Sequence, residues 1–207
     1  MLTLFGMPGA CSLAPHIALE EAGIPFQYSM IRKSHPEDRE NLLKLNPMGQ
    51  VPTLLFDDGT VLTQNSAILS WIAEQVPGKK LLPPPGTIEH ARAQEWLSFL
   101  GTTIHPAYGP IFSPAKYVSS EANFDDVKQV TKAKLERGFE IVESRLGDGP
   151  WALGETFSVV DPYLYVFFSW IGVPGIDAAK YPKIQRHAEA LRARESAKRA
   201  FATEKIR

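Results

Sequence analysis

The chemistry that this chain of 207 residues suggests centres on its single cysteine. Cys11 follows a glycine-containing turn at the start of an expected helix, where unpaired N–H groups and the helix dipole favour a thiolate. A buried cysteine that packs as a small apolar group would explain the same position equally well. There is no Cys-x-x-Cys motif, so a reactive Cys11 would need a thiol from outside the chain as its partner.

Ser12 and His105 are the other side chains that could take part in such chemistry. The hydroxyl of Ser12 either donates a hydrogen bond to a thiolate at Cys11 or caps the helix. His105 precedes Pro106 near the end of a helix, and either points its titratable ring toward a cleft between domains or is a structural residue. The other four histidines show no metal-ligand spacing with cysteine or carboxylates, so we expect no metal.

Two backbone segments could bind an extended or anionic ligand. About one X-Pro bond in twenty is cis in folded proteins, so the residues alone favour a trans bond between Val51 and Pro52. If the bond is cis, the N–H and C=O of Val51 face outward, unpaired, and can hold an extended peptide. The N–H groups of Gln64-Asn65-Ser66 lie between a strand and a helix and form a site for a carboxylate, although Asn65 as a plain N-cap explains the same letters.

The first third of the chain alternates strand and helix patterns that would position these residues. We expect strands at 2–5, 26–31, 51–56 and 61–63, and helices at 11–22, 37–45 and from Asn65 to the residues before Pro77. Gly23 is placed to end the first helix, and Asp57-Asp58-Gly59 is a hairpin turn. The order is βαβαββα, and we assign residues 1–77 to one domain.

The remainder of the chain has helical periodicity. Residues 78–87 contain three successive prolines and are assigned to a linker, and residues 88–207 to an all-α domain, which makes the fold class α+β. Ser158 and Asp161 have the form of a capping box before a helix that is apolar almost all round. The apolar positions of the other helices are Ala93, Trp96, Leu97, Leu100 and Ile104, then Val127, Val130, Leu135, Phe139, Val142 and Leu146, then Ile184, Ala188 and Leu191.

Composition points to a small partner in the cytoplasm. The 22 Lys and Arg nearly balance the 23 Asp and Glu, so no long-range field would attract nucleic acid or an anionic membrane. The last 28 residues carry nine basic and three acidic side chains, and we interpret them as a solvated helix face. One cysteine excludes an intrachain disulfide, and no signal peptide or bilayer-spanning run is seen. In the cytoplasm the obvious partner thiol for Cys11 is glutathione.

Five segments carry a resemblance to a known family. They are PGACSLAPHIALEEAG at 8–23, NPMGQVPTL at 46–54, LTQNSAI at 62–68, EWLSFL at 95–100 and FSVVDPYL at 157–164. In order and spacing they resemble the beta-class glutathione S-transferases, over nearly the whole chain. The resemblance implies a thioredoxin-like N-terminal domain, an all-α domain, a homodimer, and a glutathione site in the N-terminal domain at the domain boundary.

The resemblance also implies roles for individual residues. Cys11 matches a cysteine that forms a mixed disulfide with glutathione or approaches its sulfur. Val51 matches the residue whose backbone holds the cysteinyl part, so Pro52 is expected cis. His105 matches a histidine near the thiol. The other expected contacts are Gln64 and Asn65 at the γ-glutamyl end, Gln50, Ser98, Lys33 as candidate for the glycine carboxylate, and Tyr108, Phe112 and Tyr117 in the wall of an acceptor pocket.

At some positions the chain departs from the family pattern. Gln64 and Asn65 stand where glutamate then glycine, or glutamate or glutamine then serine, is usual, so the Gln64 amide can still hydrogen-bond but one charge is absent; Ser98 and Thr103 stand where asparagine and glutamate are common. Charged hydrogen bonds contribute about 1.5 to 3 kcal/mol each, so their loss would lower the affinity for glutathione roughly tenfold to a hundredfold.

The sequence therefore predicts a transferase that binds glutathione, stabilises its thiolate and directs it at a small apolar electrophile. Cys11 could instead support thiol–disulfide or dehalogenation chemistry through a glutathionyl adduct. A rival from another class is a non-catalytic ligand-binding or partner-binding protein that keeps the fold. Isomerase work on a dicarbonyl acid would need cationic residues that we do not identify.

Overall fold

The computed structural model describes residues 1–206 and begins with a four-stranded sheet. The strands are β1 (Leu2–Gly6), β2 (Phe26–Met30), β3 (Thr53–Leu55) and β4 (Val61–Thr63). Their order in the sheet is β2-β1-β3-β4, in which β1 pairs parallel with β2 and antiparallel with β3. The helices of this part are α1 (Leu13–Ala22), α2 (Pro36–Leu45) and α3 (Asn65–Gln75), so the βαβαββα order is confirmed.

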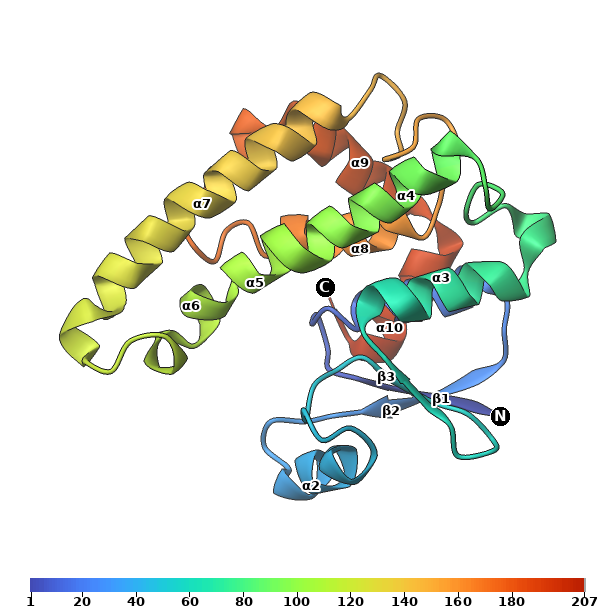
Figure 1. Ribbon diagram of the computed structural model, residues 1–207, viewed down its shortest axis with the longest axis horizontal. Helices are drawn as coiled ribbons and strands as arrows, with labels where there is room; N and C mark the ends of the chain where they lie inside the picture. The colour runs from blue at the N-terminus through green and yellow to red at the C-terminus, as the bar shows by residue number, and fades with distance from the viewer. Residues whose placement is uncertain (207) are drawn as a thin grey trace.

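Helix α1 lies at the centre of the structure. Its first seven residues are all buried, because α1 packs against α3, α8 and α10. Gly23 ends it in the left-handed conformation, at a φ of 68°, and donates its N–H to the carbonyl of Leu19. In Figure 1, α3 lies on one side of the sheet and α2 on the other. This thioredoxin-like arrangement places the loop between β1 and α1, which contains Cys11, at the boundary with the helical part.

The rest of the described chain is helical. Its main helices are α4 (Ile88–Phe99), α7 (Phe124–Arg145), α8 (Val160–Ser169), α9 (Pro182–Ala193) and α10 (Glu195–Glu204). Helix α8 is buried from Val160 to Phe167, as its uniformly apolar sequence predicts, and α4 and α7 form the long outer pair in Figure 1. Val130 was wrongly placed on the apolar stripe of α7, since its side chain is 65% exposed. Among the described residues, no helix has both the length and the apolar character that crossing a membrane requires.

A π-helical segment at Leu100–Ile104 joins α4 to the short helices α5 (His105–Ala107) and α6 (Gly109–Phe112). Pro106 has no N–H to donate, and the N–H of His105 bonds to the carbonyl of Leu100, five residues back. Pro106 thus coincides with a change from α-helical to π-helical hydrogen bonding, although the chain stays helical through α5 and α6. The wider π-helical turn sets the direction in which the His105 side chain points.

The capping box before α8 is extended by two long-range bonds. Asp161 is fully buried and accepts the Ser158 N–H at 2.6 Å, which is the reciprocal bond of a capping box. The same carboxylate accepts the Ala152 N–H at 2.7 Å and pairs with His187 Nε2 at 3.0 Å. These bonds tie the start of α8 to the preceding loop and to α9.

The basic C-terminal segment is only partly the solvated face that its charge suggests. Helix α10 packs on α1, with Ala197 and Ala200 fully buried. Arg194 bonds to Glu21, and Arg199 Nε bonds to Glu20 at 2.6 Å. Positive charge at the end of the chain is therefore used in part to attach α10 to the acidic end of α1.

Candidate active site

A polar cavity of about 160 Å³ lies between the sheet domain and the helical domain. None of its lining side chains belongs to Lys, Arg, Asp or Glu, so the hydrogen-bonding groups there are neutral amides, hydroxyls and one imidazole. The lining residues are Asn46, Gln50, Val51, Pro52, Thr63, Gln64, Asn65, Ser66, Gly101, Thr102, His105 and Tyr163. The two domains thus each supply one wall, and the sequence-based site residues Gln50, Val51, Pro52, Gln64, Asn65 and His105 meet here.

The bond between Val51 and Pro52 is cis, as the family resemblance predicts. The Val51 carbonyl is not unpaired, because the thiol of Cys11 donates a hydrogen bond to it with an Sγ–O distance of 3.2 Å. Within the described chain, no hydrogen bond uses the Val51 N–H. Only half of the expected peptide-binding edge is therefore open in this structure.

Cys11 is a buried thiol in this structure, which favours the second of the two interpretations of its position over a thiolate. Its side chain is 7% exposed, and α1 begins two residues later than expected, at Leu13. Burial raises the pKa of the thiol to about 11, and it outweighs hydrogen bonds from the Asn65 side chain and the N–H groups of Cys11 and Ser12, which lower it. The helix start therefore moderates the pKa of Cys11 but does not bring it below its ordinary value.

Gln64 and Asn65 form the start of α3 at the edge of the cavity. Gln64 has a φ of 73°, a left-handed conformation that is uncommon for a residue with a side chain and that is often found at functional sites. Asn65 is the first helical residue and not the N-cap, and its side chain makes no capping bond. It is 6% exposed, and its Oδ1 is buried without a hydrogen-bond partner. The plain N-cap interpretation of Asn65 is therefore wrong.

His105 faces the cavity beside a tyrosine that sequence reasoning assigned to the buried core. Its Nδ1 lies 3.2 Å from the hydroxyl of Tyr163 on α8. Burial lowers the pKa of His105 below its ordinary value, which favours the neutral ring at neutral pH. The apolar pattern of α8 hides Tyr163, because a tyrosine in such a helix also fits a purely structural role.

An aromatic cluster continues from His105 toward the surface. Trp170 contacts Tyr108 and Phe112 edge-on, with ring centroids 5.2 Å apart in both pairs. Phe112 is 50% exposed, whereas Tyr108 is buried and donates its hydroxyl to the Phe167 carbonyl at 2.9 Å. Tyr108 therefore supports the expected aromatic wall from behind. Trp170 belongs to that wall, although it was not predicted.

The loop before Cys11 is held by residues from the far end of the chain. Trp170 Nε1 donates to the Gly9 carbonyl at 2.8 Å, and Glu204 Oε2 accepts the Gly9 N–H at 2.9 Å. The other carboxylate oxygen of Glu204 pairs with Nδ1 of buried His16 at 2.7 Å. This arrangement is not visible in the sequence, because Glu204 lies 195 positions from Gly9.

Three expected site residues have other surroundings. The Ser12 hydroxyl accepts the Met7 N–H at 3.0 Å, so it supports the loop and neither caps α1 nor bonds to Cys11. Lys33 is exposed in the segment before α2, and Ser98 is exposed on α4, where its carbonyl accepts the Thr102 hydroxyl. Neither residue is among those that line the polar cavity.

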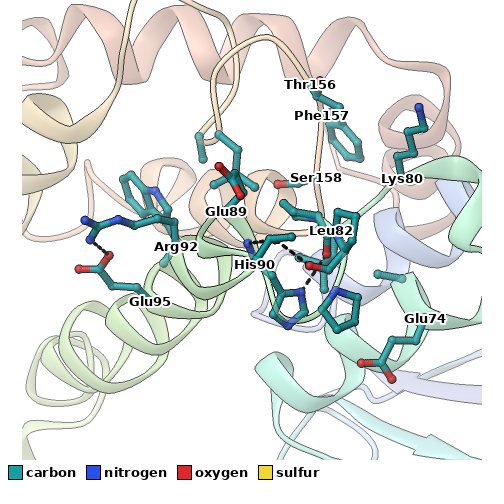
Figure 2. A pocket seen from close by; sticks show the side chains of 18 of the residues that line it. Glu74, Lys80, Leu82, Glu89, His90, Arg92, Glu95, Thr156, Phe157 and Ser158 are labelled. Carbon is teal, nitrogen blue, oxygen red and sulfur yellow. Dashed lines mark hydrogen bonds and ion pairs between the residues drawn. The ribbon is translucent and has the colours of Figure 1, made fainter.

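A larger hollow of about 1260 Å³ lies at the linker, away from Cys11. Figure 2 shows Arg92 directed at Glu95, with a Nη1–Oε2 distance of 2.8 Å, and His90 bonded to the linker backbone. Three acidic and three basic side chains line it, and none of the expected site residues does, whereas six of them line the smaller cavity. The smaller cavity is therefore the candidate active site. Within residues 1–206, no cluster of three or more His, Cys, Asp or Glu could hold a metal ion.

The fold and the cavity define a protein with a thioredoxin-like domain, an all-helical domain and a polar site between them. The family model for the glutathione S-transferase N-terminal domain matches residues 9–75, and the model for the C-terminal domain matches residues 125–190. The chain is 36% identical to glutathione S-transferase GstA of Escherichia coli O157:H7 over 171 residues, which is 82% of each chain. It belongs to the glutathione S-transferase family of enzymes.

Solved structures give the same result. A beta-class glutathione S-transferase of Sphingomonas chungbukensis is 37% identical, with a TM-score of 0.88 over 99% of this chain and all of that one. A sphingomonad glutathione S-transferase in complex with glutathione is 36% identical, with a TM-score of 0.86 and the same coverage. The thioredoxin-like and all-α architecture expected from the beta-class resemblance is thereby confirmed.

Proposed function

We propose that this protein transfers the glutathione thiolate to small apolar, aromatic electrophiles. The observation that carries the proposal is the position of the neutral polar cavity between Val51–Asn65 and His105, because the His105 ring contacts Trp170 of the aromatic cluster with ring centroids 5.9 Å apart. A polar peptide thiol and an apolar acceptor could occupy adjoining surfaces there, with their reacting atoms close together. The sphingomonad relative that was solved with glutathione supports the identity of the thiol.

The geometry suggests how glutathione would bind. The free Val51 N–H is available to the cysteinyl main chain, and the N-terminal N–H groups of α3 favour the γ-glutamyl carboxylate. A cavity of about 160 Å³ is smaller than most ligand pockets and would hold the thiol end, with the rest of the tripeptide along the open surface.

In this proposal the Cys11 thiol stays protonated and donates its hydrogen bond to the Val51 carbonyl, and the nucleophile is the sulfur of glutathione. The bond from Cys11 to the Val51 carbonyl and the raised pKa of the thiol both keep Cys11 protonated near neutral pH. Thiol–disulfide or dehalogenation chemistry through Cys11 would need a thiolate, so we give it second place.

The test compares wild type with Cys11→Ala. Calorimetry should give a dissociation constant for glutathione below the millimolar range in both proteins, and both should conjugate a chlorinated dinitrobenzene. Treatment with oxidised glutathione followed by mass spectrometry should show any adduct in wild type alone. Loss of conjugation in Cys11→Ala, with binding intact, would transfer the nucleophilic role to Cys11.

A non-catalytic ligand-binding protein with this fold is the alternative. The departures from the family pattern at Asn65, Ser98 and Thr103 are the reason to consider it. Millimolar or absent glutathione binding would favour this alternative. We also infer, from the family resemblance, a homodimer that acts in the cytoplasm. Analytical ultracentrifugation would test the dimer, because a monomer at micromolar concentration contradicts it.

A further inference from the structure

Trp170 joins the aromatic wall to the loop that contains Cys11. Its ring contacts Tyr108 and Phe112 edge-on, with centroids 5.2 Å apart in both pairs. Its indole Nε1 donates at the same time to the Gly9 carbonyl, at 2.8 Å. One side chain therefore contacts both the surface expected to bind the electrophile and the backbone two residues before Cys11.

The helix that carries Trp170 gives this loop a rigid support. Trp170 is the C-cap of α8, which is buried from Val160 to Phe167, and its backbone N–H donates to the Phe167 carbonyl at 3.2 Å. Both backbone polar groups of Gly9 are bound by the helical domain, since Trp170 donates to its carbonyl and Glu204 accepts its N–H at 2.9 Å. Contacts with the helical domain thus fix the loop at Gly9.

One further hydrogen bond connects this loop to the peptide-binding edge. The thiol of Cys11 donates to the Val51 carbonyl with an Sγ–O distance of 3.2 Å. Val51 lines the polar cavity, and its N–H is the group that the proposed function assigns to the cysteinyl main chain of glutathione. Because only Ala10 separates Gly9 from Cys11, a displacement of Gly9 would strain or break the bond between Cys11 and Val51.

We propose that Trp170 is a positioning residue for the thiol site: its indole N–H, through Gly9, keeps Cys11 and Val51 in the arrangement that binds glutathione. This inference rests on the proposed function and goes beyond it, because a residue of the wall for the electrophile would also set the affinity for glutathione. Trp170 is not among the residues that line the polar cavity, so its effect on glutathione would be indirect. A loop that is already ordered in the free protein lowers the entropic cost of binding.

The test compares Trp170→Phe with Trp96→Phe. Trp170→Phe keeps an aromatic ring but has no N–H to donate to Gly9. Trp96 is the matched control, because it is a buried tryptophan of the same domain that lies at the linker hollow. The dissociation constant for glutathione, measured by calorimetry, should rise about two- to tenfold in Trp170→Phe, which corresponds to the loss of one neutral hydrogen bond. It should stay unchanged in Trp96→Phe.

Alkylation of Cys11 by iodoacetamide at a fixed pH tests the same contact without glutathione. A loop that opens more often exposes the buried thiol more often, so the rate in Trp170→Phe should also rise about two- to tenfold. Trp96→Phe should react at the wild-type rate.

Phe112→Leu separates the wall from the loop. It removes a ring that Trp170 contacts but leaves the indole N–H free to bind Gly9. This variant should raise the KM for a chlorinated dinitrobenzene and leave the dissociation constant for glutathione unchanged.

The outcomes distinguish this proposal from the proposed function. If Trp170→Phe binds glutathione and reacts at Cys11 as the wild type does, the role of Trp170 is overturned and the proposed function stands. Equal changes in Trp170→Phe and Trp96→Phe would indicate general destabilisation and also overturn that role. If the wild type does not bind glutathione, the proposed function fails, whereas faster alkylation in Trp170→Phe alone would still support the hold of Trp170 on the loop.

If Trp170→Phe does not fold, NMR of the wild-type protein provides the readout. The indole N–H signal of Trp170 should shift when glutathione binds, because its acceptor Gly9 belongs to the loop of Cys11, and the signal of Trp96 should not. An unshifted Trp170 signal at saturating glutathione would overturn the proposal.

Discussion

Replacement of Glu204 tests whether the end of the chain holds the loop of Cys11. Glu204 is 2% exposed, and its two oxygens accept the Gly9 N–H at 2.9 Å and pair with His16 Nδ1 at 2.7 Å. Glu204→Ala would leave both buried groups without this partner. An unsatisfied buried group costs about 1 to 3 kcal/mol, and loss of one member of a buried pair about 3 to 5 kcal/mol. We expect the free energy of unfolding to fall by about 3 to 5 kcal/mol.

Glu204→Gln should cost less, about 1 to 2 kcal/mol, because an amide of the same size still offers one acceptor oxygen. The assay is urea unfolding at a fixed protein concentration, followed by tryptophan fluorescence, with the shift in midpoint read at constant slope. Glu195→Ala is the control from the same helix, since Glu195 pairs only with Lys198 in an exposed i,i+3 bridge, and it should cause no measurable change. If Glu204→Ala unfolds at the same urea concentration as Glu195→Ala, the buried network does not stabilise the protein.

Three further predictions follow from individual contacts. Alkylation of Cys11 by iodoacetamide should be slow at neutral pH and should become faster as the pH approaches the pKa of the thiol, which burial raises to about 11. A rate that levels off near the ordinary cysteine pKa of about 8.5 would contradict this. Gly138→Ala should destabilise the protein by about 1 kcal/mol in thermal unfolding, because overlap of its Cβ with Cδ1 of buried Ile104 costs about 1 to 3 kcal/mol and the helix propensity of alanine offsets about 1 kcal/mol of it; a neutral result would show that the end of the Ile104 side chain moves aside. Burial alone would raise the pKa of Glu21, but hydrogen bonds, led by that from Arg194, lower it below 4.5. The stability that the ionised Glu21 contributes is therefore present near neutral pH and is lost as the pH falls through the lowered pKa. The stability difference between wild type and Arg194→Gln should therefore shrink in acid, and a pH-independent difference would assign the effect to packing on Phe157 instead.

Periodicity was sufficient to predict most of the fold. The strand at 26–30 and the buried helix at 160–169 follow from spacing within one segment, where each side chain meets neighbours a few residues away. Val130 shows the limit of this approach, because it matches the apolar stripe of α7 but is 65% exposed. Helix α10 was not separated from the preceding helix, since its attachment depends on charges of α1 that lie far away in sequence.

The candidate site was predictable to the extent that single motifs encode it. Position 11 and the start of α3 are local features, whereas the cis bond before Pro52 was expected from the family resemblance alone, since the residues themselves favour trans; the cavity joins this bond and the start of α3. Tyr163 and Trp170 were missed because their polar atoms meet groups 58 and 161 residues away, and the apolar pattern of the helix at 160–169 assigned Tyr163 to the core. The choice between a thiolate and a buried thiol at Cys11 stayed open for a related reason: a helix start is visible in sequence, but the degree of burial is not.

The hydrogen bonds that hold Gly9 have a consequence for folding during translation. The sheet and its first helices are translated early, yet the peptide before Cys11 makes its bonds to Trp170 and Glu204, which are synthesised 161 and 195 residues later. Folding on the ribosome can therefore build the thioredoxin-like domain long before the loop is fixed. Until Trp170 and Glu204 are synthesised, the loop that contains Cys11 lacks these bonds, and the nascent chain exposes the thiol to cellular oxidants and thiols.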